Sequence, residues 1–273
     1  MIALTKRNRP MKQPDSTRDN SWRTPQDPVP DLQFAVRDLQ RAFLRVADNL
    51  RWYEQSWLGV PIWQLADDLV ALQRIVFDAD PKWIVETGTK FGGSAIFFAS
   101  ILAMMGRKPG ADGGVITVDN HETTEARELL GEAPHRLAPY VRQRLVGDAK
   151  SPDILAAIAA AIAADPGPVM VFLDDWHDGE HVYAELLGYS KLVTPGGILI
   201  VADTSFEDLA DTPIVAASKK YPDAKRSNPR VALRRFLAER SDFAAVPDYT
   251  STGISNFPDS VLRKAAVESG NST

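Results

Sequence analysis

The stretch from Trp83 to Ser94, WIVETGTKFGGS, constrains the fold more than any other part of the sequence. It begins with an apolar run that is typical of a parallel strand buried on both faces. Gly88, Gly92 and Gly93 follow, and glycine lets a backbone turn tightly and approach a ligand closely because it has no Cβ atom. A strand, a glycine-rich turn and a helix in this order predict a small-ligand site. An ordinary tight turn is the alternative.

The turn does not match two common nucleotide-binding motifs. It lacks the Gly-Lys-Ser/Thr ending that holds a triphosphate with magnesium, and its glycines do not have the G-x-G-x-x-G spacing of dinucleotide sites. Glu86, at the end of the strand, suits a ligand that carries positive charge. S-adenosylmethionine (SAM) has a sulfonium and an α-amino group, so we expect it as the cofactor.

The rest of the chain alternates between strand-like and helix-like segments, which predicts an α/β fold. The expected strands are Trp83–Thr87, Gly114–Asp119, Tyr140–Val146, Val169–Asp174 and Gly197–Asp203, and the expected helices are Ser94–Met105, Thr123–Leu130, Pro152–Ala163 and Glu180–Leu192. Such a chain forms a doubly wound, mostly parallel sheet with ligands at the carboxyl ends of its strands. A helix over Pro229–Glu239 is expected next, then antiparallel strands at Phe243–Val246 and Asn256–Lys264.

The N-terminal third divides into two parts. Residues 1–30 are rich in proline and polar residues and are expected to form a flexible arm or a strap between subunits of an oligomer. Residues 31–80 are expected to form a helical extension, with helices over Asp31–Arg51 and Leu65–Phe77 and a dense aromatic cluster between them. Such clusters are typical of core packing or subunit contacts, so we expect a homo-oligomer. Residues 81–273 then form the main domain.

Composition narrows the chemistry and the partners. The chain has 273 residues, a net charge of −5 and no cysteine. Thiol nucleophiles, disulfides and thiolate metal sites are therefore excluded, and a metal has to use oxygen or histidine ligands. An acidic chain argues against a nucleic-acid partner. No apolar run reaches membrane-spanning length and the N-terminus has no apolar signal core, so we expect no membrane partner and a cytoplasmic location.

Acidic residues end or follow the expected strands, which indicates a polar pocket. Asp119 is placed to accept hydrogen bonds from a ribose; the alternative is a helix N-cap near Thr123. Asp148 contacts an adenine amine or caps the helix that begins near Pro152.

Asp174 and Asp203 follow long apolar strands and are expected to meet at one rim of the sheet. Two carboxylates suit a hard divalent cation such as Mg²⁺, which keeps water and substrate oxygens as its other ligands. A cation there would lower the pKa of a substrate hydroxyl, and His177 would remove its proton. The other histidines, His121, His135 and His181, are expected to be solvated or to cap helices. An iron site built on His177 and His181 is a much weaker match.

Together these segments resemble the SAM- and metal-dependent O-methyltransferases often labelled the cephalosporin hydroxylase family, which are related to macrolide-sugar O-methyltransferases. The resemblance runs from about Trp57 to the C-terminus. The segments that carry it are WLGVPIW, IVETGTKFGGSAIFFAS, VITVD, LVGDAKSPD, FLDDWHDGEHVYAELLGYSKLVTPGGILIVADT and NFPDSVLRK.

The resemblance implies a Rossmann-like class I SAM methyltransferase fold and a role in specialised metabolism such as antibiotic biosynthesis. It implies the following sites: catalytic His177 and Asp174; cofactor-binding Glu86, Gly88, Thr89, Gly92, Ser94, Asp119, Asp148 and Asp174; and the metal ligands Asp174, Asp203 and Thr204.

One residue departs from the family pattern. The family usually has Glu-Asp-Thr at the fifth strand, whereas this chain has Ala202 before Asp203 and Thr204. Alanine cannot ligate a metal, and the Thr204 hydroxyl or Asp175 is the expected substitute. The expected function is O-methylation of a small specialised metabolite or sugar. The alternatives are a non-catalytic SAM-binding assembly or regulatory subunit with a degenerate metal site and, less favoured, an NAD-dependent oxidoreductase.

Overall fold

The computed structural model describes residues 32–216, 219–246, 249–250 and 253–266. The predicted N-terminal arm, residues 1–30, lies outside them. A seven-stranded sheet forms the centre, in the order β5-β4-β3-β6-β7-β9-β8. Its strands are β3 (Trp83–Thr87), β4 (Gly114–Asp119), β5 (Val141–Val146), β6 (Val169–Leu173), β7 (Ile198–Val201), β8 (Phe243–Ala245) and β9 (Val261–Lys264). The first five are parallel, and β9 runs antiparallel to β7 and β8. The predicted α/β fold with its antiparallel C-terminal strand is confirmed.

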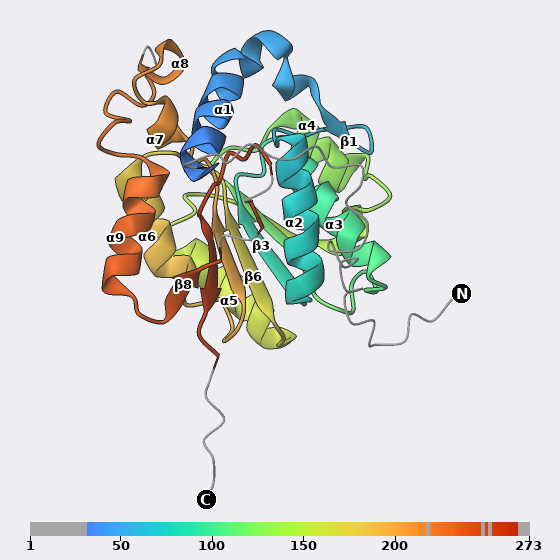
Figure 1. Ribbon diagram of the computed structural model, residues 1–273. Helices are drawn as coiled ribbons and strands as arrows, with labels where there is room; N and C mark the ends of the chain where they lie inside the picture. The colour runs from blue at the N-terminus through green and yellow to red at the C-terminus, as the bar shows by residue number, and fades with distance from the viewer. Residues whose placement is uncertain (1–31, 217–218, 247–248, 251–252, 267–273) are drawn as a thin grey trace, which may run out of the picture.

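Helices cover both faces of the sheet (Figure 1). Their bounds are α1 (Leu32–Ala47), α2 (Ala66–Ala79), α3 (Gly93–Met104), α4 (Thr124–Arg127), α5 (Pro152–Ala164), α6 (Gly179–Tyr189), α7 (Phe206–Leu209), α8 (Pro213–Ala216) and α9 (Pro229–Glu239). One apolar core joins α5, α6 and α9 to the sheet, and a second joins α2 and α3 to its other face. The predicted boundary between residues 80 and 81 falls on the turn between α2 and β3, although α2 shares the core of the sheet.

A hairpin of β1 (Ser56–Trp57) and β2 (Val60–Pro61) covers the start of α3. A Cβ atom at Gly93 would lie 2.1 Å from the Pro61 carbonyl oxygen, so only glycine permits this contact. The Trp57 indole packs on Phe97, with ring centroids 5.0 Å apart, and donates a hydrogen bond to the Ser100 hydroxyl. The hairpin thereby brings the N-terminal extension over the carboxyl edge of the sheet.

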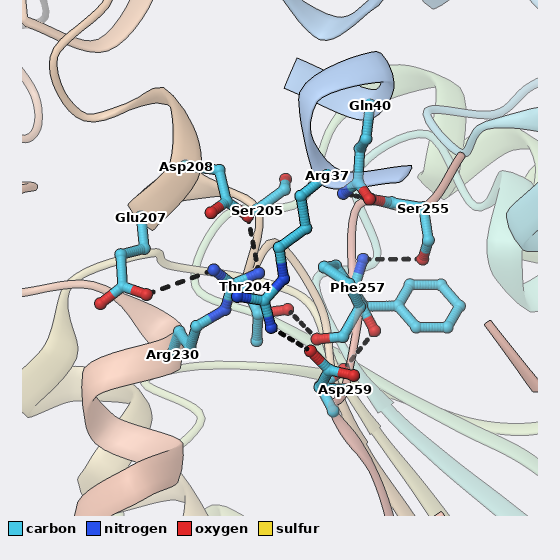
Figure 2. Close-up of polar contacts among 12 residues, drawn as sticks. Arg37, Gln40, Thr204, Ser205, Glu207, Asp208, Arg230, Ser255, Phe257 and Asp259 are labelled. Atoms are coloured by element: carbon cyan, nitrogen blue, oxygen red, sulfur yellow. Dashed lines mark hydrogen bonds and ion pairs between the residues drawn. The ribbon is translucent and has the colours of Figure 1, made fainter. Parts of the chain in front are cut away.

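Polar contacts attach α1 to the loop between β8 and β9 (Figure 2). Arg37 pairs with Asp259 at 3.2 Å, and the buried Gln40 amide donates to the Ser255 carbonyl.

No helix in the described ranges is both long and apolar enough to cross a bilayer.

Candidate cofactor and metal site

Two adjoining cavities, of about 270 and 250 Å³, open at the carboxyl ends of the parallel strands. Gly88, Lys90, Asp174 and Asp175 line both of them. Parallel strands end at this edge of the sheet, which is where ligands bind in doubly wound folds. The predicted ligand site and the cavities therefore coincide.

The glycine-rich turn forms one wall. Gly88 has φ +89°, and a Cβ atom there would lie 2.1 Å from the Asp174 carbonyl oxygen. Gly92, with φ +84°, precedes α3 as its N-cap. Ser94, in the first turn of α3, lines the larger cavity, as does Thr89, whose hydroxyl is 2.6 Å from that of Thr117.

Glu86 is the most deeply buried acid of the site. Its side chain is fully buried in β3, and neither carboxylate oxygen makes a hydrogen bond within the described part of the chain. The pKa of Glu86 is raised to about 7 by burial. The nearby hydroxyls of Thr117 and Ser94 act in the opposite direction and limit this rise. A cationic ligand nearby would stabilise the ionised form of this carboxyl.

Asp119 ends β4 and holds together the loops that follow β3 and β4. Its carboxylate accepts hydrogen bonds from the backbone N–H groups of Lys90, at 2.8 Å, and His121, at 3.1 Å. It also lines the second cavity. The alternative of a helix cap by Asp119 is wrong, because Thr123 caps α4 by accepting from Ala126. The predicted ribose contact stays a prediction.

Asp148 lies apart from these groups. It lines neither cavity, and it pairs with Lys150 at 2.7 Å. The helix-cap alternative is wrong here too, because Ser151 caps α5. Its predicted adenine contact stays a prediction.

Asp174 and Asp203 meet in the larger cavity, as predicted. The pKa of Asp174 lies well above its ordinary value because the side chain is buried and the Asp203 carboxylate is close to it. Gln64 donates to Asp174 Oδ2 at 2.6 Å. Asp203 has φ +54°, so the chain bends sharply just beyond β7 to turn this carboxylate inward. Two neighbouring carboxylates that repel each other fit a divalent cation, which would neutralise both.

Thr204 points elsewhere. Its side chain is fully buried, lines neither cavity and donates a hydrogen bond to the Pro258 carbonyl oxygen at 2.9 Å. Ala202 is buried in the core. Of the two expected substitutes for the missing glutamate, only Asp175 lines the cavity.

His177 is held beside Asp203. Its Nδ1 atom is 3.3 Å from Asp203 Oδ2, and its ring packs against Phe206 and Tyr221 at centroid distances of 4.9 and 5.4 Å. These contacts fix the imidazole at the rim of the cavity. A histidine in this position can accept a proton from a hydroxyl that binds next to Asp203.

His181 belongs to a different cluster. Its Nε2 atom is 3.1 Å from Asp175 and 3.7 Å from the buried Glu185. The expectation that His181 is solvated or caps a helix is therefore wrong, and Asp178 caps α6 instead. The iron site on His177 and His181 is not assembled, because each histidine pairs with a different carboxylate. The spacing of His181 and Glu185, one helical turn apart, could have indicated their pairing.

Sequence reasoning missed several residues of the larger cavity. Trp63 and Phe91 pack together at 5.6 Å, and the Lys90 ammonium lies 4.0 Å above the Trp63 ring. Gln64 and Lys220 also line it. No local pattern could have found Gln64, which is 110 residues from its partner Asp174.

A sequence profile of the family described as Rhamnosyl O-methyltransferase/CmcI matches residues 49–265. The rhamnosyl O-methyltransferase of Mycobacterium tuberculosis (strain H37Rv) is 30% identical over 158 residues, which cover 58% of this chain and 60% of that protein. The Mycobacterium leprae protein of the same name is 29% identical over 162 residues, covering 58% and 63%. The match thus spans less than two thirds of the length of these relatives.

Solved O-methyltransferase structures share the fold. A CmcI structure described as "Mg-SAM" aligns with a TM-score of 0.52 at 17% identity, covering 78% of each chain. The O-methyltransferase TomG from Streptomyces achromogenes, in complex with SAM, aligns with a TM-score of 0.51 at 22% identity, covering 85% of this chain and 90% of TomG. These likenesses show the class I SAM methyltransferase fold.

Proposed function

Since the chain belongs to the rhamnosyl O-methyltransferase/CmcI family, we propose that it transfers a methyl group from SAM to a hydroxyl of a small specialised metabolite or sugar, assisted by a divalent cation such as Mg²⁺. The observation that carries this proposal is the meeting of Asp174, Asp203 and His177 in one cavity beside the glycine-rich turn. The relatives' name, rhamnosyl O-methyltransferase, supports a sugar or a glycosylated metabolite as the acceptor.

Each part of the site has a role in this reaction. Glu86 and the turn from Gly88 to Ser94 hold the methionine part of SAM, and Asp119 holds its ribose. SAM would supply a methyl group on a positively charged sulfur, and a cation held by Asp174 and Asp203 would favour the ionised form of a bound hydroxyl. His177 accepts the hydroxyl proton, and the carboxylate of Asp203 stabilises the imidazolium that results.

The proposal is tested by calorimetry with S-adenosylhomocysteine and Mg²⁺. We expect both to bind. Asp203→Asn should lower the affinity for Mg²⁺ at least tenfold, while the affinity for S-adenosylhomocysteine should stay within about threefold of the wild type. Asp211→Asn is the control, since Asp211 is an exposed acid that pairs with Arg41. Equal Mg²⁺ affinity in the three proteins would exclude the metal site at Asp203.

A cofactor-binding subunit without catalysis is the second candidate, and the buried Ala202 favours it because one family ligand is missing. It predicts binding of S-adenosylhomocysteine with no specific Mg²⁺ binding, so the same titrations separate the two functions. The NAD-dependent alternative is set aside, because the family and the fold are those of methyltransferases.

We also propose a homo-oligomer formed through the N-terminal extension. Leu39, Val46 and Leu50 expose large apolar side chains there, as do Tyr53 and Trp63 of the aromatic cluster. An exposed apolar surface of this kind is typical of a subunit contact.

A further inference from the structure

A third cavity, of about 190 Å³, lies behind the rim of the candidate site. We call it the apolar chamber. Its walls are mainly Leu44 of α1, Leu65 before α2, Leu209 of α7 and Val215 of α8, with the rings of Trp52 and Phe206. These side chains belong to an apolar cluster separate from the two cores of the sheet. The chamber is therefore not a packing defect of the central fold.

The chamber adjoins the candidate reaction site. Trp52, Asp203 and Phe206 line both the chamber and the larger cavity. A molecule whose body fills the chamber can thus present a group to Asp203 and to His177, which packs on Phe206.

One polar group of the chamber has no acceptor for its proton. The Tyr221 side chain is more than nine-tenths buried and lines the chamber. The His177 backbone N–H is near enough to its hydroxyl oxygen to lower the pKa, but the hydroxyl donates no hydrogen bond within the described residues. Burial also raises the pKa of Tyr221, so the hydroxyl stays protonated and can donate. Buried hydroxyls normally donate to an acceptor, so this unused proton points to an acceptor atom on a ligand.

We propose that the apolar chamber binds the body of the methyl acceptor, and that this body is an apolar ring or short chain with one hydrogen-bonding group for Tyr221. This inference rests on the proposed function and names the substrate class of the same site. A cavity of about 150 Å³ lined by apolar side chains is known to hold benzene, so the chamber suits one substituted six-membered ring. A free sugar does not suit it, because its several hydroxyls would be buried with few partners.

The wall formed by α1 gives this helix a role in acceptor selection. Leu44 and Ala47 face the chamber from the last turns of α1. The contacts of Arg37 and Gln40 with the loop before β9 hold the helix in place (Figure 2). Side chains of α1 therefore set the size of the acceptor body.

Binding of p-cresol and toluene tests the proposal. The two probes share a ring and a methyl group, and only p-cresol carries a hydroxyl. We expect both to bind the full chain saturated with S-adenosylhomocysteine, measured by calorimetry or ligand-observed NMR. Ala47→Phe, which fills the chamber, should lower the affinity for both probes at least tenfold. Ala42→Phe, the same change at an exposed position of α1, should alter neither more than twofold.

A second pair of variants tests the hydroxyl and does not depend on the folding of Ala47→Phe. Tyr221→Phe should lower the affinity for p-cresol about three- to tenfold and leave the affinity for toluene unchanged. Tyr183→Phe is the matched control, since the Tyr183 hydroxyl donates to Glu239 away from the chamber. Equal p-cresol affinity in the wild type, Ala47→Phe and Tyr221→Phe would overturn the proposal.

The titration with S-adenosylhomocysteine alone separates this inference from the proposed function. If the aromatic probes bind as expected and S-adenosylhomocysteine does not, the methyltransferase proposal and the acceptor role fail together, while the chamber stays as an aromatic site. If S-adenosylhomocysteine binds and the probes do not, the chamber proposal alone is overturned.

Discussion

Gly88 is the residue at which the turn comes closest to the end of β6, where Asp174 follows the strand. Its positive φ and the 2.1 Å approach to the Asp174 carbonyl oxygen both require glycine. We expect Gly88→Ala to lower the free energy of unfolding by about 3 kcal/mol or more. Gly106→Ala should cost only about 1 kcal/mol, because Gly106 has φ +80° with open space around it. Urea unfolding measures both, and equal losses would contradict the importance of the close contact.

Glu86 makes stability depend on pH. Its pKa is about 7 in the folded chain, compared with the ordinary value of 4.5 for a glutamate side chain. The folded state therefore binds more protons between these pH values, and its stability falls as pH rises through this window, by up to about 3 kcal/mol. We expect Glu86→Gln to be more stable than the wild type at pH 8 and nearly equal to it at pH 4.5.

Thermal unfolding at the two pH values measures this difference. Comparing the variant with the wild type also cancels the effect of Asp68, whose pKa is likewise raised to about 7 by burial. Glu86→Gln should lower the affinity for S-adenosylhomocysteine about tenfold if Glu86 holds the cofactor. If Glu86→Gln were less stable than the wild type at pH 8, the proposed cost of burying the ionised Glu86 carboxylate would be refuted.

The sequence predicted some site residues well and others poorly. Asp174 and Asp203 could be paired because parallel strands end at the same edge. Thr204 follows Asp203 directly, yet the positive φ of Asp203 and a hydrogen bond to Pro258 turn it away from the cavity. Tyr221 lies in a segment without periodicity, so no pattern indicated that it lines the chamber.

Among the elements, α7 depends on α9 for its position. Arg230 of α9 is almost buried and pairs with Glu207 at 3.2 Å and with Asp208 at 2.7 Å, both on α7 (Figure 2). Arg234 also pairs with Glu207 but is largely exposed. We expect Arg230→Met to lower the free energy of unfolding by about 3 kcal/mol, because the partly buried Asp208 loses its partner and Glu207 keeps only the exposed Arg234.

Arg234→Met is the matched control and should cost less than about 1 kcal/mol, because exposed ion pairs contribute little. Chemical denaturation of both variants measures the difference. Hydrogen exchange should also rise in α7 for Arg230→Met alone. Similar losses in the two variants would show that burial of Arg230 does not decide its contribution.

Long elements were predicted more accurately than short ones. The predicted bounds of β3, β4 and α9 are confirmed to the residue. The β1–β2 hairpin, α7 and α8 were not predicted, because elements of two to four residues show no hydrophobic period. The predicted helix over Thr123–Leu130 is helical in the structure, but only Thr124–Arg127 is α-helical, and a π-helix continues it from Glu128 to Glu132.

For the whole molecule, the exposed apolar side chains of the N-terminal extension lead to a prediction about assembly. We expect sedimentation velocity to show an oligomer, and Leu39→Glu combined with Leu50→Glu to shift it toward the monomer, because buried charges destabilise an apolar interface. S-adenosylhomocysteine affinity should stay unchanged. Leu187→Glu, at an exposed position on α6, is the control. A wild type that sediments as a monomer would refute the oligomer.

The position of β9 has a consequence for how this protein is made. β9 follows all the other strands of the described residues in sequence but lies between β7 and β8. A nascent chain on the ribosome therefore presents β7 with an open edge until residue 264 has left the exit tunnel. Open apolar edges attract other chains. Completion of the sheet must then wait until β9 has been synthesised, and during that interval the growing polypeptide is a natural client for chaperones.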